Sequence, residues 1–173
     1  MSMYLIPYTE KCIMNKIIYV IPGWEECCGD PQYQRLASMA KERGYDVRLH
    51  DVDWTQPLSS QVFSVPPEAI VFGFSLGAIL ACLVAQQYPC QHLILASMTP
   101  RESFTDPKVK KSLIDLAGQA FVDDIISTLR PTHQAKIQTT LYGDQEDTAA
   151  DILVPNTEHE INAAYIAEIK KLL

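Results

Sequence analysis

A serine flanked by two glycines stands where a short apolar strand passes into an apolar helix. The strand is expected at 69–72, the pentapeptide Gly73-Phe74-Ser75-Leu76-Gly77 follows, and the helix runs from about Leu76 to Tyr88. In a tight turn from strand to helix, a side chain in place of either glycine would collide with neighbouring backbone. The pattern therefore predicts a sharp turn with Ser75 at its apex.

Short apolar runs alternate with helical stretches along the whole chain, which is typical of a parallel sheet with crossover helices. We expect an α/β fold with a mostly parallel sheet of about six strands, helices on both faces, and one domain over 1–173. Strands are expected at 16–21, 46–50, 69–72, 92–96, 137–142 and 152–154, and helices at 31–43, 76–88, within 106–129 (one or two, separated at Gly118) and at 160–173.

Charge and composition limit the classes of partner. The chain of 173 residues has 14 basic and 21 acidic side chains and a net charge of −7, so nucleic acid and anionic membrane surfaces are not expected partners. The start of the chain does not resemble a signal peptide and no apolar run could span a membrane, so we expect a cytoplasmic protein. Its five cysteines include no Cys-x-x-Cys, which disfavours disulfides and a metal site.

The sequence resembles the α/β-hydrolase fold family. The resemblance rests on Ile17 to Trp24, Ile70 to Ala81, Leu141 to Asp147 and Thr157 to Ile161, and these segments cover the pattern of most of the chain. It implies a minimal form of that fold, with strand order 2-1-3-4-5-6 and little or no cap. It also implies a catalytic triad in the chain order serine, acid, histidine.

This order selects the candidate catalytic residues. A serine hydroxyl is a weak nucleophile until a base takes its proton, so Ser75 needs a histidine. Of the four histidines only His159 follows the acidic turn after the fifth strand. The acid that would orient it is Glu146 or Asp147, and the choice between them stays open; Asp144 is a weaker candidate.

An oxyanion needs two hydrogen-bond donors, and the same resemblance indicates where they come from. One is the Leu76 amide at the start of the helix after the turn, and the other is the Trp24 amide after the first strand. Trp24 and Met98 are expected to line the substrate pocket, and Trp54 is a further candidate.

These residues predict a serine hydrolase that cleaves a carboxylic ester or thioester through an acyl-enzyme, without cofactor or metal. The expected partner is a small acyl ester or thioester, free or attached to a carrier. The alternative is a non-catalytic binding protein with the same fold. A flavodoxin-type phosphate binder is disfavoured, because the chain has no phosphate-binding glycine loop.

Overall fold

The computed structural model describes residues 16–146 and 148–173 and contains the predicted parallel sheet. Its strand order is β2-β1-β3-β4-β5-β6, and every paired neighbour is parallel, so the predicted class and order are confirmed. The strands are β1 (Lys16–Ile21), β2 (Tyr45–Leu49), β3 (Ile70–Phe74), β4 (Cys90–Ala96), β5 (Ala135–Gly143) and β6 (Ile152–Val154).

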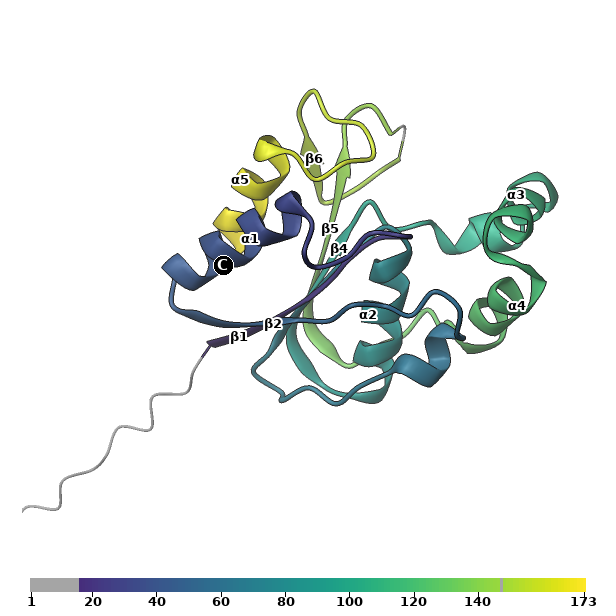
Figure 1. Cartoon of the computed structure of the whole chain (residues 1–173), viewed down its shortest axis with the longest axis horizontal. Helices are drawn as coiled ribbons and strands as arrows, with labels where there is room; N and C mark the ends of the chain where they lie inside the picture. Colours follow the sequence, from purple (N-terminus) through teal and green to yellow (C-terminus); the bar gives the residue numbers. More distant parts are fainter. Residues whose placement is uncertain (1–15, 147) are drawn as a thin grey trace, which may run out of the picture.

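Helices cover both faces of the sheet (Figure 1). Helices α1 and α5 contact each other on one face, while α2, α3 and α4 lie on the other. No helix within the described ranges is long and apolar enough to cross a membrane. The helices are α1 (Pro31–Glu42), α2 (Leu76–Gln87), α3 (Pro107–Ala117), α4 (Gln119–Thr128) and α5 (Ala163–Leu172), with 3₁₀ turns η1 (Leu58–Gln61) and η2 (Arg101–Phe104).

The two faces form two apolar layers, because successive side chains of a strand point to opposite sides. In β3, Phe72 packs with the α1 and α5 layer, and Val71 packs with the α2 layer. Every residue of α2 from Leu76 to Ala85 is buried. A helix that is apolar all round must be enclosed, and burial on all sides fixes the start of α2 at the serine turn.

One expectation about the helices needs correction. The last helix begins at Ala163 rather than 160, because the Asn162 side chain accepts a hydrogen bond from the Tyr165 N–H (3.1 Å) and caps it there. No residue of α3 is fully buried and Leu116 is 55% exposed, while Leu113, Ile114 and Ala117 pack partly buried against the α2 layer. Gly118 separates α3 from α4 as expected, with a φ of 88° that suits glycine.

Candidate active site

The turn between β3 and α2 has the geometry that the pentapeptide predicts. Ser75 has a φ of 53° and a ψ of −124°, a conformation that non-glycine residues seldom adopt and that costs about 1–3 kcal/mol. A Cβ at Gly77 would lie 2.0 Å from the Pro22 carbonyl oxygen, and one at Gly73 would lie 2.6 Å from Ala78 Cα. The expectation that both positions require glycine is therefore confirmed.

Three side chains from three loops at the carboxyl edge of the sheet meet at this turn. His159 Nε2 lies 2.8 Å from Ser75 Oγ, and His159 Nδ1 lies 2.8 Å from Glu146 Oε2. An ionised carboxylate can only accept hydrogen bonds, so Nδ1 carries the ring proton and Nε2 is left to accept from the serine hydroxyl. The structure thus brings together Ser75, His159 and Glu146, and it gives the imidazole the orientation of a base.

Close contact between the loops after β5 and β6 makes this geometry possible. A Cβ at Gly143 would lie 2.1 Å from the Thr157 carbonyl oxygen, so the glycine that ends β5 lets the histidine loop lie against it. Asp144 accepts a hydrogen bond from the Thr157 N–H (3.2 Å) and so holds the loop rather than the imidazole. Asp147 lies outside the described residues.

The Glu146 carboxylate is itself held in place by donors that sequence reasoning missed. Its Oε1 accepts from the Gly143 N–H (2.8 Å) and from the Ser97 hydroxyl. Ser97 in turn lies 2.9 Å from the Tyr165 hydroxyl, which donates to the Leu141 carbonyl (2.6 Å). Burial above all raises the pKa of Tyr165, so its hydroxyl stays protonated. The only signal for Ser97 in the sequence is its position directly after a buried strand.

A cavity of about 240 Å³ opens beside the serine, lined by Trp24, Glu26, Phe74, Ser75 and His159. The ring of Trp24 packs against Trp54 and Phe121, with centroid distances of 5.0 and 5.5 Å. Half of the His159 side chain surface is exposed (51%), so the cavity is accessible from solvent. Trp24 therefore lies where a pocket residue was expected, whereas Glu26 was not foreseen.

The two expected oxyanion donors lie in the segments that border the serine. Leu76 is the first residue of α2, where the backbone amides are not used by the helix itself. Trp24 lies in the turn that the Glu26 N–H closes on the Gly23 carbonyl (3.2 Å). The close approach of Pro22 to Gly77 packs this turn against the serine turn between β3 and α2.

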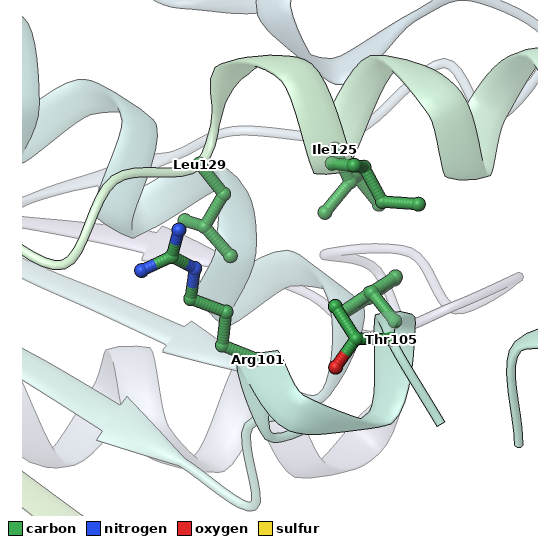
Figure 2. Close-up of a pocket in the computed structure, with 6 residues that line it drawn as sticks. Arg101, Thr105, Ile125 and Leu129 are labelled. Atoms are coloured by element: carbon green, nitrogen blue, oxygen red, sulfur yellow. The ribbon is translucent and has the colours of Figure 1, made fainter. Parts of the chain in front are cut away.

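Met98 is not brought to the serine. Its sulfur lies 3.7 Å from the Cys82 Sγ, and it lines a separate cavity of about 190 Å³ with Arg101 and Leu129 among others. Arg101 and Leu129 also border a small cavity of about 80 Å³ between η2 and α4 (Figure 2). Met98 was expected in the substrate pocket because it lies in the loop after the fourth strand, but its side chain packs against Cys82 of α2. The expectation that Met98 binds substrate has no support in this geometry.

Comparisons with known proteins identify the fold. No family model matches the sequence, and no curated protein matches it. Solved structures do match. Mouse alpha/beta hydrolase domain-containing protein 10 is 13% identical with a TM-score of 0.65, and the alignment covers 90% of this chain and 87% of that one.

Two further structures give the same result. MGS-MChE2, an alpha/beta hydrolase enzyme from the metagenome of lagoon sediments at Mar Chica, Morocco, is 16% identical, with a TM-score of 0.58 and coverage of 91% and 88%. Esterase B from Lactobacillus rhamnosis is 18% identical, with a TM-score of 0.53 and coverage of 75% of this chain and 57% of that one. The chain therefore has the α/β-hydrolase fold, as the resemblance in sequence predicted.

Proposed function

We propose that this protein is a serine hydrolase that cleaves carboxylic esters or thioesters, with Ser75 as nucleophile, His159 as base and Glu146 as the acid. One observation carries the proposal: both ring nitrogens of His159 lie 2.8 Å from their partners, one from the serine hydroxyl and one from the carboxylate. A hydroxyl, an imidazole and a carboxylate hydrogen-bonded in this order activate a serine for acyl transfer.

The reaction proceeds in two steps. Ser75 Oγ attacks the substrate carbonyl carbon while His159 Nε2 takes the hydroxyl proton, and the carbonyl π electrons move to the oxygen. The amides of Leu76 and Trp24 hold this oxyanion. When it collapses, the bond to the alcohol or thiol breaks and His159 protonates the leaving group. A water that gives its proton to the same ring then hydrolyses the acyl-enzyme, and the proton returns to Ser75.

The accessible cavity favours small acyl groups, or an acyl group that protrudes from a carrier. Hydrolysis is favoured as the reaction because the fold is found in proteins named as hydrolases and, in one neighbour, as an esterase. Fold alone does not choose between ester and thioester. A binding protein without catalysis would have no need of a strained serine hydrogen-bonded to an oriented imidazole.

Hydrolysis assays on two matched serine variants test the proposal. Ser75→Ala should lower kcat/KM for p-nitrophenyl acetate and for an acetyl thioester by at least about 1,000-fold. Ser112→Ala on α3 should leave kcat/KM unchanged, because the Ser112 side chain is exposed and its hydroxyl donates only to the Lys108 carbonyl of the same helix (3.3 Å). Equal rates for wild type and Ser75→Ala would instead favour the non-catalytic binding protein.

A further inference from the structure

The cavity beside Ser75 is also lined by Glu26, an acidic side chain that takes no part in the proposed acyl transfer. A Cβ placed on Gly23 would lie 2.5 Å from Glu26 Oε2 and 3.3 Å from Ser75 Cβ, so the Glu26 carboxylate and the nucleophile are close neighbours. Both line the same cavity, together with Trp24, Phe74 and His159. Whatever occupies this cavity during hydrolysis must therefore lie beside a carboxylate.

Glu26 is held in place by hydrogen bonds from neutral donors. Its oxygens accept from the Gly23 N–H (3.1 Å), the Tyr33 hydroxyl (2.5 Å) and the Gln32 side-chain amide (3.1 Å). Burial, and then the Glu26 hydrogen bond, raise the pKa of Tyr33, so this hydroxyl stays protonated and donates. Three donors suit an ionised carboxylate. No Lys or Arg of the described residues forms a salt bridge with it.

The surrounding loops carry charge of the same sign. The segments after β1, β5 and β6 (residues 22–30, 144–146 and 155–162) contain no Lys or Arg. A cleft lined by charge of one sign raises the local concentration of ions of opposite sign. The acidic side chains of these segments are Glu25, Glu26, Asp30, Asp144, Glu146, Glu158 and Glu160.

Aromatic rings complete the chemistry of the cavity. Trp24 and Phe74 line it beside the carboxylate, and of the two only Trp24 is partly exposed, because Phe74 packs against His159 and Tyr165. The face of an aromatic ring attracts an ammonium group. A carboxylate next to a partly exposed indole ring therefore suits a cation and repels an anion. A substrate cation at this point would also offset the repulsion between Glu26 and the oxyanion that forms at the nearby carbonyl.

We propose that the preferred substrates of this site are cationic esters or thioesters, in which an ammonium group a few bonds from the scissile carbonyl contacts Glu26 and Trp24. The inference rests on the proposed hydrolytic function and names its substrate class. Glu26 would then act as a specificity-determining residue, separate from the groups that perform the acyl transfer.

Two thioesters of equal shape test this inference in one thiol-release assay. Acetylthiocholine carries a quaternary ammonium, and S-(3,3-dimethylbutyl) thioacetate has a neutral carbon in its place. From an exposed cation–π contact and one charge pair in a high dielectric, wild type should prefer acetylthiocholine by about tenfold in kcat/KM. Glu26→Gln should reduce this ratio to about threefold or less, while Glu42→Gln, an equal loss of charge on the exposed end of α1, should leave it intact.

Salt gives a second measurement that needs no variant. Raising the ionic strength from about 0.02 M to about 0.5 M should lower the ratio for wild type severalfold, since screening weakens attraction between exposed charges. A ratio near one, or a ratio that neither Glu26→Gln nor salt reduces, overturns the inference while hydrolysis itself still stands. If neither thioester nor p-nitrophenyl acetate is hydrolysed in a manner that depends on Ser75, the proposed function fails first.

Discussion

Replacing Glu146 by glutamine keeps the shape of the side chain and should reverse the role of the histidine. Oε1 receives two donors, the Gly143 N–H and the Ser97 hydroxyl, so the amide oxygen of the new side chain must occupy that position. Its NH₂ group then faces His159 Nδ1, where a carboxylate oxygen now lies at 2.8 Å. An NH₂ group donates, so the ring proton moves to Nε2, which can no longer accept the proton of Ser75.

The expected loss is about 10,000-fold in kcat, as in the serine protease in which the triad acid was replaced by its amide and the wrong tautomer resulted. That loss corresponds to about 5 kcal/mol of transition-state stabilisation. KM should change little, because Glu146 does not line the cavity at Ser75. The assay is steady-state hydrolysis of p-nitrophenyl acetate by Glu146→Gln and by Asp147→Asn, with thermal melts of both to establish folding.

The neighbouring acid provides the control, because the sequence allowed either residue to orient the histidine. Asp147→Asn should retain most of the activity. If Glu146→Gln keeps more than about a tenth of wild-type kcat while Asp147→Asn loses it, the tautomer argument is refuted and Asp147 takes the place of Glu146.

Three further predictions follow from particular contacts. Ser97→Ala removes one donor to the Glu146 carboxylate and should lower kcat about tenfold with KM unchanged; an equal change in both would assign Ser97 another role. Gly77→Ala places a Cβ 2.0 Å from the Pro22 carbonyl oxygen, so it should lower the melting temperature by several degrees and abolish hydrolysis. A fully active variant would contradict the geometry of the serine turn. Burial raises the pKa of the Cys28 thiol from 9.0 to about 12, so the stability that the neutral buried thiol contributes is complete below about pH 9 and is lost as the pH rises toward 12. At pH 8.5 iodoacetamide should therefore alkylate exposed Cys27 well before buried Cys28. Equal labelling of the two thiols in the native state would refute this prediction.

The parts of the fold that follow from local pattern were predictable from the sequence. Strands β1 and β6 have the predicted limits, because Pro22 ends the apolar run of β1, and Asp151 and Pro155 bound that of β6. The serine turn was predictable because only glycine fits at positions 73 and 77. Chain order then pointed to His159, which the structure brings to Ser75.

The remaining features depend on tertiary contacts that no local pattern encodes. Glu26 looks like an ordinary loop residue, and only the fold places it beside Ser75. Ser97 and Tyr165 are 68 positions apart and meet only because the Tyr165 side chain extends from α5 to the ends of β4 and β5. The Met98 side chain contacts Cys82 of α2, which is 16 positions away in the sequence.

The most direct test of the account is the intact mass of the protein after reaction with a fluorophosphonate, which traps a serine activated by a neighbouring base. Wild type should gain one adduct, on the peptide that contains Ser75, and Ser75→Ala should gain none. Equal labelling of the two proteins, or labelling of neither, would contradict the claim that His159 activates Ser75.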